Sequence, residues 1–472
     1  MFYLLKEPWT FRGFKGLPYA LRCEYGEHKH DKPLFLEKEV FMSLLDCNGE
    51  TDIDESLFSD KTRKAFEEFV EQDVLQLSDS PLPPLKSWQR YIVYPARFMR
   101  KIHWSITGKC NFRCRHCLVS APEAKHPQLP LEECLHIVDE IASCGIREVD
   151  ITGGEPLLRK DFAQIVEALS KKGIDIGVVF TNASLLNENT LRILKDNHQH
   201  PVFQLSFDGL GHHDWLRGIK GAEEDADKAF RLLKDNGYTS VAAMCIHKEN
   251  KDSLRATIRY LADLNVSALR VNAPQSLGLW KKYADEYALS KEETAEIYKE
   301  CISCFFEDGM LLDLSLDGYF EGKKGKTEYT VPLSRNTKED SDYLSYPYCE
   351  SLRYNAYIGP DGRLAPCMGF SDTALKEKFP NVLEEHLGPL TLNGYYYDVA
   401  NTKVSAFIDR NPECAKCEHL PKCLGGCMVE GIDDEGNYLL PDLHACYFHK
   451  HVGEEMIRKI ADEAIVRYCF DI

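Results

Sequence analysis

The middle of the chain, residues 88–318, alternates apolar strand-like segments with amphipathic helical segments. The expected strands are residues 102–107, 148–152, 175–181, 203–207, 240–246 and 268–272, with helices such as 131–144, 161–172 and 223–236 between them. Strands that alternate with helices form parallel sheets covered by helices. The pattern therefore predicts an α/β fold with a partial parallel (β/α)6 barrel of the TIM type. In such barrels, functional residues follow the carboxyl ends of the strands.

Two regions of different character flank the barrel. Residues 1–84 contain strand-like segments at 1–5 and 17–24 and helical periodicity at 37–47 and 61–77, which predicts a small α+β module of winged-helix type. Residues 78–86, rich in proline, form the expected linker. Residues 346–451 are rich in Cys, Gly and Pro and lack regular apolar periodicity, which is typical of a region held by metal. Residues 452–472 predict a C-terminal helix.

Composition narrows the possible partners. Hydrophobic residues make up 44% of the 472, enough to bury cores, and the formal net charge is -18. An acidic balance argues against nucleic acid as the main partner, because phosphate binding requires a basic face. We find no secretory signal pattern and no apolar window of the length that a membrane span requires. The sequence therefore predicts a cytoplasmic protein with no nucleic-acid or membrane partner.

Eighteen cysteines are present, and their spacing is strongly clustered. In a cytosolic protein such clustering indicates metal or iron–sulfur ligation. Cys110, Cys114 and Cys117 form a C-x3-C-x2-C triplet directly after the first expected strand. Three thiolates can hold three irons of a cubane cluster and leave the fourth iron open. The alternatives are a zinc site with His116 as a further ligand, or reduced core cysteines.

The triplet resembles that of the radical S-adenosylmethionine superfamily, and further segments match that family in order. Residues 152–156, TGGEP, resemble its GGEP motif, and residues 206–209, SFDG, followed by Asp214 and Arg217, resemble a second motif. The resemblance implies that Cys110, Cys114 and Cys117 hold the 4Fe-4S cluster. It also implies contacts to S-adenosylmethionine from His116, Gly153, Gly154, Glu155, Asn182, Ser206, Asp208 and Arg217. Without the triplet, both motifs could be ordinary turns after strands.

Seven later cysteines resemble the SPASM extension of the same superfamily. The resemblance implies one auxiliary 4Fe-4S cluster on Cys349, Cys367 and Cys427 and a second on Cys414, Cys417, Cys423 and Cys446. The expected cofactors are therefore S-adenosylmethionine and three 4Fe-4S clusters. The first auxiliary cluster then has three protein ligands, so its fourth ligand stays open. Zinc knuckles are the alternative for the C-x2-C-x5-C-x3-C stretch.

The remaining cysteines that we interpret lie in expected helices or strands. Cys301 and Cys304 belong to an amphipathic helix over residues 294–307. Cys134, Cys144 and Cys245 also fall inside expected elements. We expect all five to pack in the hydrophobic core.

The N-terminal module resembles the small winged-helix domains that grip the leader of a ribosomally made precursor peptide by adding a strand to a sheet edge. The resemblance therefore implies an oxidoreductase-type radical enzyme that modifies such a peptide, most closely by thioether formation, with flavodoxin or ferredoxin as reducing partner. Carbon–carbon crosslinking, epimerisation, formylglycine formation of the sulfatase-maturase type and a non-catalytic zinc module remain alternatives. The module could also be a structural cap on the barrel. The sequence identifies no general base.

Overall fold

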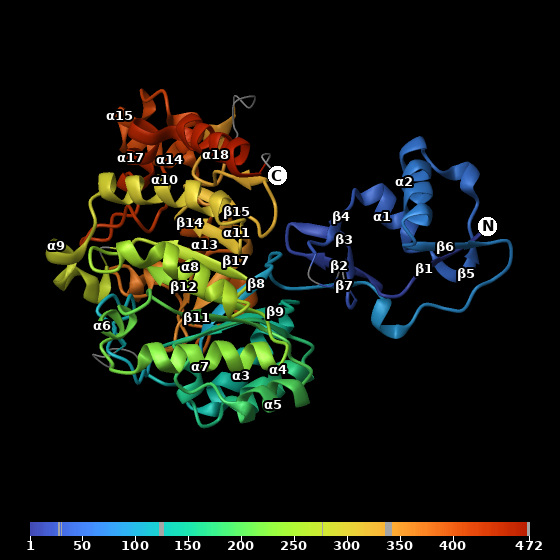
Figure 1. Ribbon diagram of the computed structural model, residues 1–472. Helices are drawn as coiled ribbons and strands as arrows, with labels where there is room; N and C mark the ends of the chain where they lie inside the picture. Colours follow the sequence, from blue (N-terminus) through green and yellow to red (C-terminus); the bar gives the residue numbers. More distant parts are fainter. Residues whose placement is uncertain (27–28, 30, 122–126, 276, 336–341, 470–472) are drawn as a thin grey trace.

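The computed structural model describes residues 1–469 except 27–28, 30, 122–126, 276 and 336–341. Its central sheet consists of β8 (Lys101–Ser105), β9 (Glu148–Thr152), β10 (Asp175–Thr181), β11 (Val202–Ser206), β12 (Ser240–Cys245), β13 (Ala268–Asn272), β14 (Asp313–Leu316), β15 (Phe320–Gly322), β16 (Tyr329–Thr330), β17 (Asn355–Ile358) and β18 (Leu364–Ala365). The strand order is β16-β15-β14-β13-β12-β11-β10-β9-β8-β17-β18. Figure 1 shows the N-terminal module beside this sheet and the last part of the chain packed over one end of it.

Consecutive strands from β8 to β14 pair in parallel, so their carboxyl ends share one edge of the sheet. The covering helices are α3 (Leu131–Ser143), α4 (Phe162–Lys171), α5 (Glu188–Asp196), α7 (Ala222–Asp235), α8 (Leu254–Asp263) and α10 (Lys291–Glu307). The six predicted strands are confirmed, with ends within two residues of the expected ones. The prediction of an α/β fold with a parallel, barrel-like sheet is confirmed.

The sheet is larger than the sequence predicts at both ends. β14 adds a seventh parallel strand and is followed by the antiparallel strands β15 and β16. At the other end, β17 comes from the cysteine-rich region and pairs in parallel with β8. The apolar periodicity of the sequence does not predict this strand. The buried run Ala356, Tyr357 and Ile358 is too short to give a periodic signal but is apolar enough to cover β8.

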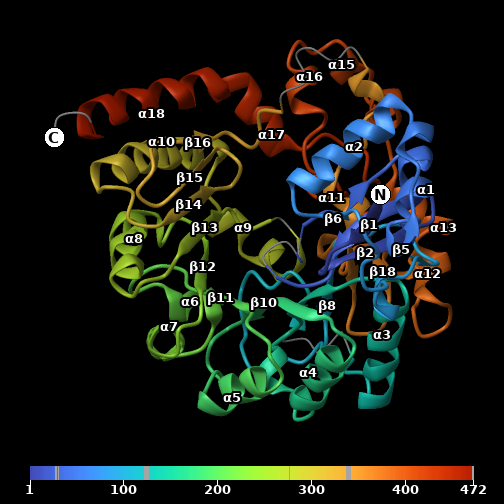
Figure 2. The ribbon, with the colours of Figure 1, turned by 90° about the vertical axis from the view of Figure 1, so that its right-hand side faces the viewer.

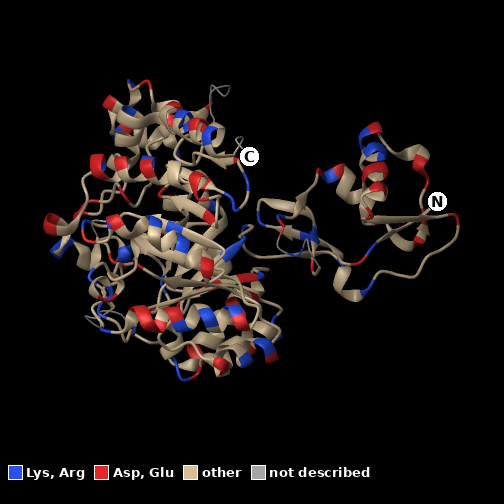
Figure 3. Ribbon diagram, in the orientation of Figure 1, with Lys and Arg blue, Asp and Glu red and all other residues tan. Residues whose placement is uncertain are grey.

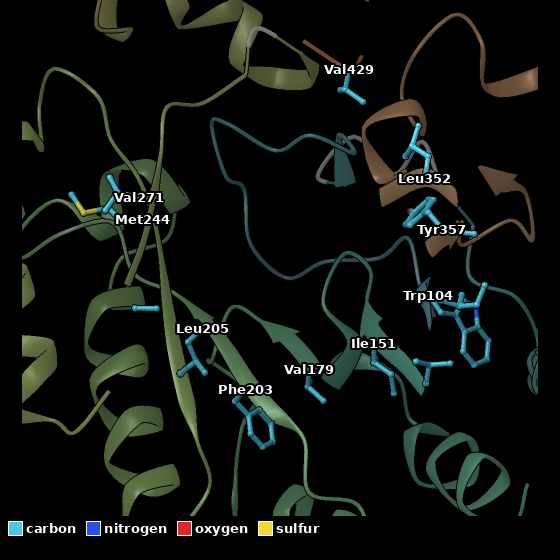
Figure 4. Close-up of a cluster of buried hydrophobic side chains, with 14 of the residues drawn as sticks. Trp104, Ile151, Val179, Phe203, Leu205, Met244, Val271, Leu352, Tyr357 and Val429 are labelled. Carbon is cyan, nitrogen blue, oxygen red and sulfur yellow. The ribbon is translucent and has the colours of Figure 1, made fainter. Parts of the chain in front are cut away.

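One hydrophobic core runs through the barrel and into the C-terminal region. In the barrel it contains Trp104, Ile151, Val179 and Phe203, which lie along successive strands in Figure 4. The same cluster continues through residues of the C-terminal region, including Leu352, Tyr357 and Val429. Because protein cores are close-packed, this continuity fixes the position of the cysteine-rich region relative to the barrel.

The N-terminal module has two small sheets and a core of its own. Its elements are β1 (Phe2–Leu5), β2 (Trp9–Phe14), β3 (Leu17–Cys23), β4 (Leu34–Phe35), α1 (Lys38–Leu44), β5 (Asn48–Asp52), α2 (Asp60–Glu71), β6 (Leu75–Ser78) and β7 (Ile92–Val93). The sheet orders are β5-β1-β6 and β4-β3-β2-β7. The expected helix over residues 61–77 is too long. The chain leaves the helix at Asp73, whose φ is +60°, and then pairs with β1.

The C-terminal region consists of short helices followed by one long helix. They are α11 (Ser351–Tyr354), α12 (Leu387–Leu390), α13 (Gly394–Ala400), α14 (Val404–Arg410), α15 (Pro412–Ala415), α16 (Leu420–Cys423), α17 (Leu443–Tyr447) and α18 (Gly453–Cys469). The predicted C-terminal helix is confirmed as α18, which lies along α10 in Figure 2, while residues 470–472 fall outside the described part. Among the described residues, no helix is both long and apolar enough to cross a membrane. Acidic and basic residues alternate along outer helices such as α7 (Figure 3).

Phe41 gives a test of the module's separate core. Its ring is fully buried and contacts the rings of Phe11, Tyr19 and Tyr91 at centroid distances of 5.7, 5.3 and 5.0 Å. We expect Phe41→Ala to destabilise the module by about 3–5 kcal/mol, because it leaves a cavity among these rings. Hydrogen exchange should increase in β2 and β3 but not in β8–β13. Met42→Ala, at a half-exposed neighbour, is the control, and equal loss of protection in the barrel strands would contradict a separate core.

Candidate functional site

The three triplet cysteines lie together in the loop after β8. The negative charge of Cys114 raises the pKa of both Cys110 and Cys117, which requires the three sulfurs to be near neighbours. Burial is the largest cause and raises the pKa of Cys110 to about 12 and that of Cys117 to about 11. Buried, clustered thiols of this kind favour a positive metal centre, which stabilises the deprotonated form. The triplet therefore fits a metal–sulfur cluster.

Backbone hydrogen bonds join the cysteine loop to the GGEP segment. The Gly154 N–H donates to the Thr107 carbonyl at 2.8 Å, and the Glu155 N–H donates to the Lys109 carbonyl at 2.8 Å. A Cβ at Gly154 would lie 2.2 Å from the Lys109 oxygen, so only glycine allows this approach. These N–H groups thus hold the cysteine loop. The carbonyl groups of the segment remain the acceptors suited to a ligand's amino group, as the resemblance implies.

Glu155, which follows β9, is hydrogen-bonded to the end of β10 in the protein interior. Its buried carboxylate accepts hydrogen bonds from the Thr181 hydroxyl and the Asn182 N–H, each at 2.8 Å. Burial raises the pKa of Glu155 to about 7. Asn182 in turn donates from Nδ2 to Asn111 Oδ1 at 2.9 Å, inside the cysteine loop. The Glu155 side chain is therefore a positioning group, and Asn182 is brought next to the triplet as the resemblance implies.

Asp208 is completely buried and surrounded by donors from the protein. Arg217 Nε donates to Oδ2 at 2.6 Å, His213 Nδ1 lies 3.0 Å from the same oxygen, and the Cys245 N–H donates to Oδ1 at 3.0 Å. Burial alone raises the pKa of Asp208, but the Arg217 charge and the His213 hydrogen bond hold it well below its usual range. In this geometry the Asp208 carboxylate holds the Arg217 guanidinium in place. Arg217 Nη1 reaches to 3.8 Å from Cys114 Sγ.

His116 offers an unused polar atom beside this group. Its Nδ1 is buried and has no hydrogen-bond partner among the described residues, and burial lowers its pKa to about 3. His116, Asp208 and Cys245 place ligand-type atoms within 4.8 Å of one another. Ser206 ends β11, two residues before Asp208. Hence all the residues expected to contact S-adenosylmethionine lie at the carboxyl ends of β8–β11 or in the segments that follow, and the orphaned nitrogen fits a bound ligand there.

Cys245 differs from its prediction. The sequence places it in the hydrophobic core, but it lies at the end of β12 against Asp208 and is only partly covered. The predicted core positions of Cys134, Cys144, Cys301 and Cys304 are confirmed, since all four are buried. An apolar strand pattern cannot distinguish a residue at the strand's last position from one in its interior, which explains the error.

Four of the late cysteines line a single cavity of about 260 Å³. They are Cys414, Cys417, Cys423 and Cys446, as expected for the second auxiliary cluster. The four thiols therefore border one space, an arrangement suited to a metal centre.

The other three late cysteines also come together. The charge of Cys349 raises the pKa of Cys367, and the charge of Cys367 raises that of Cys427, although burial is the larger cause in both. Asp442, which no sequence motif singles out, connects the two sets. Its buried carboxylate accepts from the Cys427 N–H at 2.9 Å and from the His444 N–H at the start of α17, the helix that carries Cys446. Its only signal in the sequence is an Asp at a helix N-cap.

Comparison with known proteins decides the family of the barrel. Residues 104–261 match the Radical SAM superfamily. The barrel is a radical SAM domain. Such domains use S-adenosylmethionine and a 4Fe-4S cluster, which agrees with the clustered thiols and the glycine contacts above.

The proteins that this chain resembles differ in their reported roles. The chain is 24% identical to Fe-coproporphyrin III synthase of Methanosarcina barkeri over 74% of this chain and 87% of that protein. It is 29% identical to the antilisterial bacteriocin subtilosin biosynthesis protein AlbA of Bacillus subtilis over 37% of this chain and 39% of that protein. Its fold resembles that of Streptococcus suis SuiB bound to precursor peptide SuiA, with a TM-score of 0.66, 17% identity and coverage of 94% of this chain and 99% of SuiB.

Gly154→Ala tests the contact between the GGEP segment and the cysteine loop. The added methyl group must displace the Lys109 backbone, and we expect the iron content after anaerobic reconstitution to fall by about four atoms per chain. Gly173→Ala is the control, because Gly173 also resists substitution through its φ of +66° but has no atom within 4 Å. Iron analysis and electron paramagnetic resonance of the reduced protein measure the outcome. Full iron content in Gly154→Ala would show that the loop does not depend on this contact.

Proposed function

We propose that this radical SAM protein modifies a ribosomally made precursor peptide, joining a Cys sulfur to a carbon of another residue as a thioether. The observation that carries the proposal is the separate N-terminal module, which accompanies a radical SAM barrel and a cysteine-rich region in one chain. The likeness to SuiB, solved with a precursor peptide, supports a peptide substrate because it extends over 94% of this chain. AlbA, a bacteriocin biosynthesis protein, supports the same class.

The proposal assigns a task to each region. Residues 1–84 bind the leader, residues 88–318 form the radical SAM domain, residues 346–451 form a SPASM region with two auxiliary clusters, and the C-terminal segment, residues 452–472, contains helix α18. The edge strand β4 carries Leu34, which is 37% exposed, so a leader could pair with it as an added strand. We place the enzyme in the cytoplasm with a flavodoxin or ferredoxin as its reductant.

The chain's own residues hold and orient the reactants. S-adenosylmethionine on a reduced cluster supplies a carbon radical that removes a hydrogen atom from an unactivated C–H bond. In the proposal, Cys110, Cys114 and Cys117 bind that cluster, and Arg217 presents a guanidinium suited to the carboxylate of S-adenosylmethionine. The two late cysteine sets bind the auxiliary clusters. The apolar barrel interior keeps water away from the reacting atoms.

The number of clusters gives a first test. We expect about 12 iron atoms per chain after anaerobic reconstitution, four for each of three cubane clusters. Cys417→Ala should remove about four of them, because Cys417 lines the second late site. Cys301→Ala, at a buried core cysteine, is the matched control and should keep all the iron. Zinc in place of iron at the late cysteines would contradict the proposal.

Incubation of the reduced enzyme with S-adenosylmethionine and a candidate precursor gives the second test. Each thioether should lower the peptide mass by two hydrogens and make one cysteine resistant to iodoacetamide, since its sulfur is no longer a thiol. A carbon–carbon link also removes two hydrogens but leaves every thiol reactive, and epimerisation leaves the mass unchanged. Tandem mass spectrometry with alkylation separates these outcomes. Formation of 5′-deoxyadenosine with an unmodified peptide would count against the proposed function.

A further inference from the structure

The hairpin between β14 and β15 contains an acid that a turn alone does not explain. Asp317 and Gly318 form a two-residue turn with φ values of +44° and +80°, closed by the Tyr319 N–H on the Leu316 carbonyl at 2.8 Å. Asp-Gly is a common sequence for such a turn. However, the Asp317 carboxylate also leaves the turn to accept the Ala273 N–H at 3.2 Å, just after β13. Its role therefore extends beyond the hairpin.

Asp317 lies between the two groups of cysteines. On the barrel side, its charge acts on Cys245, whose N–H binds Asp208, which in turn holds Arg217 next to Cys114. On the other side, Oδ2 lies 3.6 Å from His444 Nε2. His444 is on α17, two residues before Cys446. Because β14 is parallel to β13 and the other barrel strands, Asp317, which follows the end of β14, lies at the same edge of the sheet as the triplet loop that follows β8.

The Asp317 side chain is largely but not fully buried. It is 28% exposed, and burial raises the pKa of its carboxyl group. The ionisable groups that face it are His444, Asp442 and Glu430 of the C-terminal region, Tyr298 of α10, Tyr319 of the hairpin and Cys245 of β12. The hydroxyls of Tyr298 and Tyr319 are buried, and within the described part of the chain neither has a hydrogen-bond partner. The two rings pack edge to edge at a centroid distance of 5.3 Å, so Asp317 has rigid, fully buried aromatic neighbours on this side.

We propose that Asp317 is the general base that accepts the proton from the precursor side chain that forms the new bond, the Cys thiol in thioether formation. In this step the S–H bond breaks, an O–H bond forms on the Asp317 carboxylate, and the electron pair stays on sulfur as a thiolate. The inference rests on the proposed function and names a residue for the step that the sequence leaves without one. A carboxylate with a raised pKa is a stronger base. Its pKa is then closer to that of a thiol, about 8.5, so proton transfer from the thiol is less unfavourable.

The substitution Asp317→Asn distinguishes a role of Asp317 as a base from its role in the hairpin turn. Asn-Gly is at least as favourable as Asp-Gly in this type of turn, so the hairpin and the acceptor for the Ala273 N–H are kept while the ionisation is lost. We expect the rate of thioether formation to fall about 100-fold or more, with 5′-deoxyadenosine still formed. The wild-type rate should fall at acidic pH as Asp317 protonates, and Asp317→Asn should lose this acidic limb. Asp313→Asn, at the start of β14 and paired with Lys323, is the matched control and should behave as wild type.

Two measurements without turnover complete the test. Infrared difference spectra of cluster-loaded wild type minus Asp317→Asn, recorded without S-adenosylmethionine, should show a carboxyl C=O band that titrates above the range of an ordinary Asp. The affinity for a fluorescent precursor should change by less than about twofold, since a base acts in the reaction and not in leader binding. A variant that forms thioethers like wild type with the same acidic limb, or one that only loses affinity, overturns this inference alone. A wild type that leaves every precursor unmodified overturns the proposed function and this inference with it.

Discussion

The parallel alignment of β8–β14 is the constraint on which the site depends. Parallel strands end at a common edge, so the segments that follow them meet there although they are far apart in the sequence. The cysteine triplet, Glu155, Asn182, Asp208 and Asp317 all follow such strands. The loops are then held by backbone hydrogen bonds, such as that from Gly154 to Thr107. The geometry of the site is thus a property of the sheet more than of any single loop.

The buried carboxylate of Asp208 also helps to position the cysteine loop. Asp208 lies in the interior, where an unpaired carboxylate is strongly unfavourable. Its position is stable because Arg217, His213 and the Cys245 N–H all point to it. These partners come from the segment after β11 and from β12, and the Arg217 carbonyl accepts the Arg113 N–H within the triplet loop. The same residue therefore neutralises the buried carboxylate and positions the loop that carries the thiols.

The sequence predicts most of the barrel because its strands are continuous apolar runs between recognisable helices. It fails where the deciding contact is distant. β17 has four residues, and it joins the central sheet by pairing with β8, about 250 positions earlier. Cys245 has the pattern of a core residue, and its contact with Asp208 cannot be inferred from spacing. Asp317 reads as half of an Asp-Gly turn, because the groups that give it a second role, the Ala273 N–H and His444, belong to other segments.

The barrel is connected differently to the C-terminal region and to the N-terminal module. The barrel and the C-terminal region share one core, so the late cysteines are held in a fixed relation to the triplet. The N-terminal module has its own core. It contacts the rest of the chain through the Arg22 hydrogen bond to the Gly145 carbonyl at 2.6 Å and through a small aromatic cluster in which Phe14 packs against Phe98. It also touches the segment that carries Cys349. Lys32 lies 4.9 Å from the Tyr354 ring on α11, which begins two residues after Cys349. The module therefore contacts the barrel and also the segment that follows Cys349.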